Sequence, residues 1–299
     1  MQMKCPPAPT RWLRILPVAA TCLLLSGCTR EQFLVFNPVG PVATIEMHLI
    51  ILSLILVGIV VVPVILLLWY IVHRFRDRPD NKAPYRPEWS ESKTLEAIWW
   101  GIPIVIIGIL AVNTVHDTFR LTRPPEPTGS PLTIHVTSLD WKWLFQYPDQ
   151  KIATVNYCYI PTGRPIQFVL TADAPMNSFW VPQLGGQEYT MPGMAMRLWL
   201  QANKPGTYFG SGANFTGRGF AHMKFDVIAT SNAAFEQWAT KVRQTAPALT
   251  RDGYAQLVKQ SVVGRMSFSS FPPGLFKDII MREGGMYMKH DVNVLDNKA

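Results

Sequence analysis

The hydrophobic positions of this chain follow two patterns, which change near residue 116. Before that point apolar residues form long continuous runs, and after it they alternate with polar residues in short stretches. The run 49–72 contains one serine and no charge, and at about 1.5 Å per residue a helix of this length crosses a hydrocarbon core of roughly 30 Å. A second run, 97–115, has Trp99 and Trp100 near its start, where amphipathic rings favour a membrane interface. The two runs predict transmembrane helices at residues 45–73 and 96–116.

The loop between the predicted spans is rich in basic residues. They are Arg74, Arg76, Arg78, Lys82, Arg86 and Lys93. An excess of Lys and Arg in a short loop marks the cytoplasmic side of a membrane. We therefore expect residues 74–95 in the cytoplasm and everything after residue 116 in the periplasm.

The N-terminal segment has the order of a secretory signal. Basic residues precede a short apolar stretch at 15–25, which is too short to span a bilayer, and Leu25-Ser26-Gly27-Cys28 follows. This ending resembles the bacterial lipobox, in which the cysteine carries lipid such as palmitate and becomes the first residue of the mature chain. The alternatives are a plain signal peptide or an uncleaved anchor with an incidental cysteine. A lipid on Cys28 would tie the mature N-terminus to the outer face of the membrane.

The remainder of the chain has the texture of an exported β domain with a helical tail. Leu132, Ile134 and Val136 alternate with polar residues, and similar short runs recur between Pro and Gly turns up to about residue 230. This predicts a β-sandwich or barrel. After it, Phe235, Trp238 and Val242 return to helical spacing.

Composition and charge exclude several classes of protein. The chain has 299 residues, of which 48% are hydrophobic and only 16% charged, so it is neither disordered nor an ordinary soluble domain. The net charge of +8 comes from basic residues that are dispersed or flank apolar runs, which argues against nucleic-acid binding. Three of the four cysteines precede residue 29, so no disulfide framework is expected. The sequence contains no CxxCH haem motif, zinc spacing or phosphate loop, and we expect no catalytic residue and no metal in this chain.

The aromatic run at 139–148, Leu-Asp-Trp-Lys-Trp-Leu-Phe-Gln-Tyr-Pro, follows the two predicted spans and begins the β domain. Together these features resemble subunit II of the haem-copper terminal oxidases, over about residues 45–230. The resemblance implies a cupredoxin domain. In the cytochrome c branch of that family, this domain binds two coppers through a histidine followed by a Cys-x3-Cys-x3-His-x2-Met loop, because soft thiolate, thioether and imidazole ligands suit copper electron transfer.

The copper ligands of that family can be compared position by position. With the loop anchored on Met223, the other ligand positions are degenerate: Phe220 replaces the histidine, Thr216 and Gly212 replace the cysteines, Asn214 replaces a glutamate, and Asn177 replaces the upstream histidine. A lone thioether cannot hold a dinuclear copper centre. The site is therefore expected to carry no metal.

The sequence of this copper-less variant is similar to that of subunit II of bacterial cytochrome bo-type ubiquinol oxidases, especially at 140–143, 177–179 and 220–225. That resemblance implies a respiratory enzyme of the inner membrane that oxidises ubiquinol, reduces oxygen to water and drives protons outward. The haems, the copper and ubiquinol would belong to the large subunit I, accompanied by further small membrane subunits. A basic cytochrome c would not dock, since the domain lacks an acidic surface and a copper acceptor.

Two further site predictions follow from the resemblance. Glu96 is similar to the subunit II glutamate at the mouth of a lysine-containing proton channel. Its alternative role is to complement the dipole of the second helix, which is worth about 0.3 to 1 kcal/mol. The aromatic residues of the run are expected to pack the domain against the large subunit. They are Trp141, Trp143, Phe145 and Tyr147.

The sequence thus predicts a membrane-anchored α+β protein, with a two-helix transmembrane hairpin, a cupredoxin-like β-sandwich or barrel and a C-terminal helical extension. Two alternatives remain: a copper-bearing oxidase subunit in another register, which the absence of cysteine after Cys158 nearly excludes, and a free-standing membrane lipoprotein binding module on a cupredoxin scaffold. The expected segments are a signal peptide (1–27), a periplasmic N-terminal segment (28–44), the first span (45–73), a cytoplasmic loop (74–95), the second span (96–116), a linker (117–130), the copper-less cupredoxin-like domain (131–230) and the extension (231–299).

Overall fold

The computed structural model describes residues 33–84, 86–125 and 130–285. The predicted signal peptide and Cys28 lie outside these ranges. Of the described residues, 33–37 belong to one unit, with the short 3-10 helix η1 (Leu34–Phe36), and those from 38 onward belong to another. The features described below belong to the second unit.

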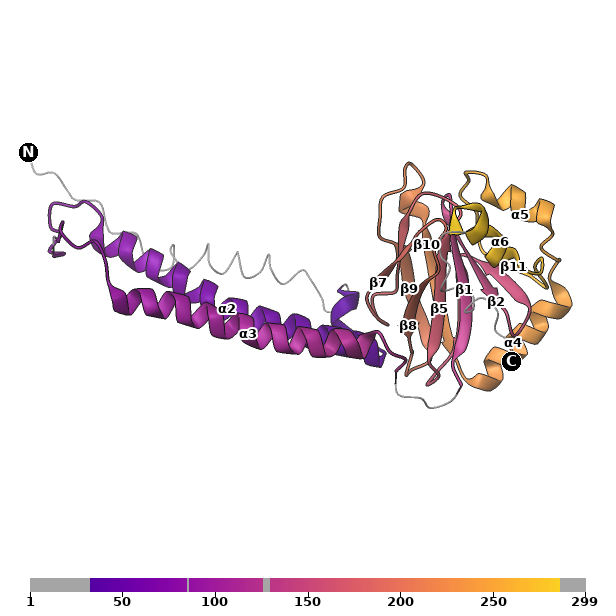
Figure 1. Cartoon of the computed structure of the whole chain (residues 1–299), viewed down its shortest axis with the longest axis horizontal. Helices are drawn as coiled ribbons and strands as arrows, with labels where there is room; N and C mark the ends of the chain where they lie inside the picture. Colours follow the sequence, from indigo (N-terminus) through magenta and orange to yellow (C-terminus); the bar gives the residue numbers. More distant parts are fainter. Residues whose placement is uncertain (1–32, 85, 126–129, 286–299) are drawn as a thin grey trace, which may run out of the picture. The chain divides into compact units, whose positions relative to one another are not determined.

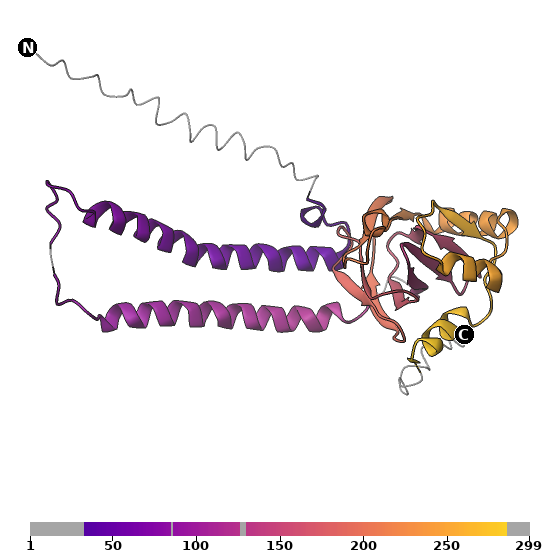
Figure 2. The same cartoon turned by 90° about the horizontal axis from the view of Figure 1, so that it is seen from above.

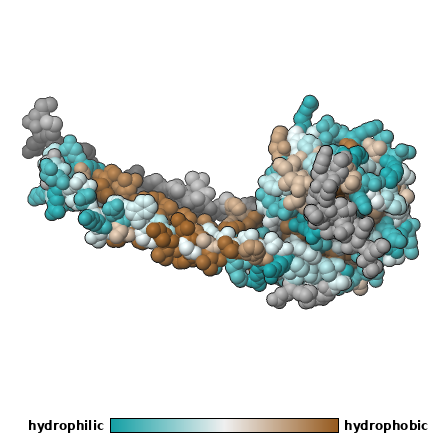
Figure 3. Space-filling model, viewed as in Figure 1, coloured by the Kyte–Doolittle hydropathy of each residue, from teal (hydrophilic) through white to brown (hydrophobic). Residues whose placement is uncertain are grey.

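Two long helices form the apolar part of the chain (Figures 1 and 2). Helix α2 (Pro41–Phe75) begins with proline at its first position, where the missing N–H is not needed. Helix α3 (Lys93–Leu121) begins at Ser92, whose hydroxyl accepts a hydrogen bond from the Leu95 amide at 3.4 Å. Both are long and apolar enough to cross a membrane. Their large apolar side chains are mostly exposed, and they form the brown hydrophobic stretches along the helices in Figure 3.

The β domain is a sandwich of two sheets (Figure 1). The six-stranded sheet has the order β11-β3-β2-β1-β5-β8, and the five-stranded sheet has the order β4-β10-β9-β6-β7. Pairs β1–β5 and β4–β10 are parallel, and the other pairs are antiparallel. The strands are β1 (Leu132–Leu139), β2 (Lys142–Tyr147), β3 (Ile152–Val155), β4 (Tyr157–Pro161), β5 (Ile166–Ala172), β6 (Asn177–Trp180), β7 (Gln187–Thr190), β8 (Met196–Leu200), β9 (Gly206–Gly212), β10 (Lys224–Thr230) and β11 (Met266–Phe268).

The core between the sheets is aromatic. The Phe179 ring centroid lies 5.4 Å from that of Trp143, 5.1 Å from Phe168 and 4.8 Å from Phe225. All four side chains are nearly or fully buried. Rings at these distances add edge and stacking contacts to the area that they bury, so the centre of the sandwich is rigidly packed.

Most of the C-terminal extension covers the outer face of the six-stranded sheet, while residues 232–245 join the main core cluster. It contains helices α4 (Asn232–Thr245), α5 (Arg251–Val258) and α6 (Leu275–Arg282). It also contributes a strand, β11, in which Ser267 pairs with Thr154 of β3. The predicted fold class, a helical membrane anchor followed by a cupredoxin-like sandwich and a helical extension, is confirmed.

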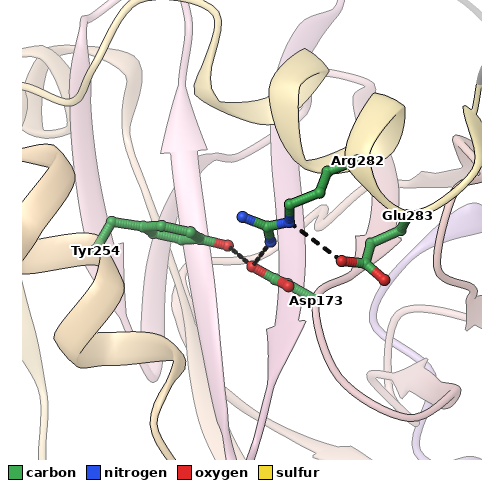
Figure 4. A network of polar contacts seen from close by, with 4 residues as sticks. All are labelled: Asp173, Tyr254, Arg282 and Glu283. Carbon is green, nitrogen blue, oxygen red and sulfur yellow. Dashed lines mark hydrogen bonds and ion pairs between the residues drawn. The ribbon is translucent and has the colours of Figure 1, made fainter.

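A polar network joins the extension to the sandwich (Figure 4). The Tyr254 hydroxyl donates to Asp173 Oδ2 at 2.5 Å, and Arg282 Nη2 reaches the same oxygen at 2.5 Å. The Asp173 side chain is 7% exposed, so this carboxylate is paired where it is largely removed from water. Burial first, and then the neighbouring Asp173 carboxylate, raises the pKa of Tyr254. The network therefore holds α5 and α6 against the loop that follows β5.

Candidate functional site

Two of the degenerate copper positions meet the surviving methionine in one buried place. Asn177 begins β6, Gly212 ends β9, and Met223 directly precedes β10. The Asn177 amide Nδ2 donates to the Met223 sulfur at 2.9 Å, and the Gly212 N–H donates to the Met223 carbonyl at 2.9 Å. A Cβ atom on Gly212 would lie 2.9 Å from the Asn177 amide nitrogen, so this side of the site has no room for a side chain without a shift.

The Asn177 amide is also satisfied at its oxygen. Oδ1 accepts from the Ser178 backbone N–H at 2.7 Å and from that of Asn214 at 3.3 Å. A third degenerate position, Asn214, thus joins the cluster through its backbone. Because buried polar groups are costly unless they are hydrogen-bonded, this neutral network satisfies the asparagine that stands at the histidine position.

The remaining two degenerate positions make their contacts elsewhere in the same loop. The Thr216 carbonyl accepts a hydrogen bond from Trp141 Nε1 at 2.9 Å. Phe220 lies in the 3-10 helix η2 (Phe220–His222), with its ring 5.7 Å from that of Phe215. A Cβ atom on Gly219 would lie 2.1 Å from the Trp141 indole. The Trp141 ring can therefore pack against the loop only because residue 219 is a glycine.

The structure corrects the prediction that the four aromatic residues within 141–147 lie at a subunit interface, because three of them are buried in the core. Trp143, Phe145 and Tyr147 are fully buried between the sheets, and only Trp141 is partly exposed. The Tyr147 hydroxyl donates to the Tyr159 carbonyl at 3.0 Å and accepts from its N–H at 2.8 Å, and burial raises the pKa of Tyr147 well above its usual value. The expectation that these side chains contact a partner is wrong for three of the four, because the sandwich core already encloses them.

Sequence reasoning missed the most exposed aromatic residue of the loop. Phe215 is 80% exposed and contacts Phe220, next to the carbonyl that holds Trp141. We call Trp141, Phe215 and Phe220 the loop patch. A large apolar residue in a glycine-rich turn was the available signal, since such turns are usually polar.

Glu96 lies in the first turn of α3, exposed, with its N–H donating to the Ser92 carbonyl at 2.9 Å. Its position agrees equally with dipole complementation and with a proton-collecting role. Among the described residues, no group of three or more His, Cys, Asp and Glu side chains could hold a metal ion. Of the ligands compared above, Met223 alone has a soft donor, so the donor set does not fit copper.

Restoring the ligand types tests the register of this site. The variant carrying Asn177→His, Gly212→Cys, Thr216→Cys and Phe220→His should bind copper and become visibly coloured, since positions 177, 212 and 223 already converge. The side chain at position 177 has to shift to make room for the new Cβ at position 212. Absorption spectra and metal analysis of the full chain measure this. The same variant with Met223→Leu is the control. A folded variant that takes up no copper would contradict the register.

The chain is similar to several known proteins. Residues 150–230 match the family model of the periplasmic domain of cytochrome c oxidase subunit II. The quinol oxidase subunit 2 of Bacillus cereus is 47% identical over 83% of this chain and 86% of its own length. The cytochrome bo(3) ubiquinol oxidase subunit 2 of Pseudomonas aeruginosa is 42% identical over 93% of this chain and 82% of its own. A solved periplasmic domain of cytochrome oxidase subunit II from Bradyrhizobium japonicum aligns with a TM-score of 0.38 and 21% identity, over 40% of this chain and 96% of its own.

Two apolar helices, a cupredoxin-like sandwich and a ligand loop without thiolates define a subunit II type of oxidase protein. The identities with full-length relatives make the assignment specific. The chain belongs to the quinol oxidase subunit 2 family.

Proposed function

We propose that this chain is the non-catalytic subunit II of a proton-pumping ubiquinol oxidase, which couples ubiquinol oxidation to the reduction of oxygen to water. The observation that carries this proposal is the contact between Asn177 and Met223, because an amide occupies the place where a copper-bearing subunit needs a ligand. The names of the relatives support ubiquinol as the electron donor, since one is a quinol oxidase subunit and another is a ubiquinol oxidase subunit. The redox cofactors and the quinol would then be bound by the large subunit.

Purification of the tagged full-length chain in mild detergent tests the proposal. We expect haem to co-purify, and oxygen uptake to be driven by ubiquinol and not by reduced cytochrome c. A colourless and inactive preparation, obtained under conditions that keep other respiratory complexes intact, would instead support a free-standing lipoprotein binding module.

The proposed membrane arrangement follows the charge pattern. The hairpin of α2 and α3 would cross the bacterial inner membrane, with the basic loop 74–95 in the cytoplasm and the β domain in the periplasm. A lipid on Cys28 would add a second anchor to the same outer face. Mass spectrometry of the mature N-terminus, with Cys28→Ala as the control, tests the lipid.

The loop patch is proposed as a contact with the large subunit. An exposed phenylalanine next to a partly exposed indole has the composition of an interface anchor. Phe215→Ser should weaken subunit association by about 1 to 2 kcal/mol, a typical loss for an apolar anchor. The yield of haem that co-purifies measures this loss, with the exposed Tyr189→Ser outside the patch as the control. Equal haem yields from both variants would remove the patch from the interface.

Glu96 is proposed to collect protons at the cytoplasmic entrance. Glu96→Gln should lower oxygen reduction roughly tenfold while the haem content stays intact, a smaller loss than the ~10²-fold of a fully positioned acid or base, because water still reaches an exposed entrance. Glu91→Gln removes the same charge just before the helix and serves as the control. Turnover unchanged in Glu96→Gln would leave only the dipole role.

A further inference from the structure

A cationic cavity lies between the start of α2 and the end of α3. It has a volume of about 500 Å³, and its lining combines apolar and basic side chains. The residues that matter are Val42, Ile45, His116, Phe119, Arg120 and Arg123. The helices are antiparallel, so this end of the hairpin lies opposite the basic loop (Figure 2). In the proposed arrangement it therefore lies at the periplasmic surface of the inner membrane.

The two arginines of the cavity have no acidic partner among the described residues. Arg120 and Arg123 are exposed, and neither forms an ion pair with another described residue. The nearby Asp117 does not line the cavity, and its Oδ1 lies 3.0 Å from Nδ1 of His116. Arg120 also complements the dipole of α3 in its last turn. Arg123 lies beyond the end of that helix, so the dipole does not explain it.

The apolar wall continues along the membrane-facing surface. Ile45 and Phe119 form part of the cavity, and exposed Val115 and Val112 follow along α3 toward the centre of the proposed span. A ligand that suits both parts has an anionic head and a hydrocarbon chain. Arginine binds phosphate through charge-assisted hydrogen bonds, and cations near a membrane surface attract anionic lipids.

We propose that this cavity binds the headgroup of an anionic phospholipid, with the phosphate at Arg120 and Arg123 and an acyl chain along Ile45 and Phe119. The proposal goes beyond the oxidase function and rests on the proposed membrane arrangement of the hairpin. The bound lipid would seal the outer end of the hairpin, where two helices alone leave polar backbone ends and apolar side chains close together.

The test uses the purified oxidase complex, stripped of lipid with detergent and titrated with phosphatidylglycerol under native mass spectrometry. Phosphatidylcholine, which has no net charge, is titrated in parallel. The variant Arg120→Gln with Arg123→Gln should bind phosphatidylglycerol roughly 30-fold more weakly, since each basic residue at a membrane surface contributes a roughly fivefold factor. Lys204→Gln with Lys241→Gln makes the same charge change in the exported domain and should bind as the wild type does.

Three results would overturn the proposal. They are equal binding by the two double variants, equal binding of the two lipids by the wild type, and displacement of phosphatidylglycerol by millimolar inorganic phosphate, which would indicate a phosphate site without a role for the chain. If the arginine double variant does not assemble, lipid binding by the two single variants and the preference of the wild type for phosphatidylglycerol still test the proposal. Haem that co-purifies while lipid preference is absent would reject the lipid site and leave the oxidase function standing.

Discussion

Replacing Lys142 with methionine should loosen helix α5 and lower the free energy of unfolding of the exported domain by about 2 to 4 kcal/mol. The Lys142 side chain is fully buried, and its Nζ donates to the carbonyls of Asp140 at 2.6 Å, Leu257 at 2.8 Å and Lys259 at 2.8 Å. The last two acceptors are at the C-terminal end of α5, where carbonyls have no partner within the helix. Methionine fills a similar volume and leaves all three carbonyls without this donor.

The charge of Lys142 moderates the size of this effect. Burial lowers the pKa of the ammonium group, and the Asp140 carboxylate partly raises it again. Methionine removes the cost of burying the charge, which is why the expected loss is below the sum of three lost bonds. Hydrogen exchange of α5 and denaturant unfolding of the full chain measure the effect, with the exposed Lys241→Met as the control. Unchanged exchange in α5 would show that this lysine does not hold the extension.

Acid should destabilise the packing of α6 on the sheet by about 2 to 3 kcal/mol between neutral pH and pH 4, through His135. The His135 ring stacks on Phe276 with centroids 4.2 Å apart, beside a cavity of about 520 Å³ that Lys151 and Lys277 also line. Burial lowers the pKa of His135 from its usual 6.5 to about 4. The unfolded chain therefore binds more protons than the folded one between these values, so stability falls as the pH drops through this window.

Unfolding of wild-type and His135→Gln chains at neutral pH and near pH 4, followed by tryptophan fluorescence in detergent, tests this prediction. The acid-induced loss should be smaller in His135→Gln by about the stated amount. His222→Gln removes an exposed histidine and should keep the full loss. An equal acid loss in wild type and His135→Gln would mean that other groups control the pH dependence.

The sequence predicted the elements that have a local cause. Long apolar runs gave α2 and α3, alternation gave the strands, and the loss of thiolates from the loop followed from residue identity alone. The family was predicted correctly for the same reason, because its motifs are short and contiguous. The interface aromatics were predicted less well: alternation places Trp143 on one face of β2 but does not say what covers that face.

Tertiary structure decided the properties that depend on distant partners. Strand β11 exists because Met266–Phe268 pairs with β3, more than a hundred residues earlier in the chain. Lys142 and Leu144 are buried because the extension covers the outer face of the sheet. The contact of Asn177 with Met223 joins β6 to the residue that precedes β10, and these two strands are not neighbours in their sheet. Periodicity along a chain determines which side of an element is apolar, whereas burial and polar contacts depend on which other element packs against that side, and only the folded chain specifies this.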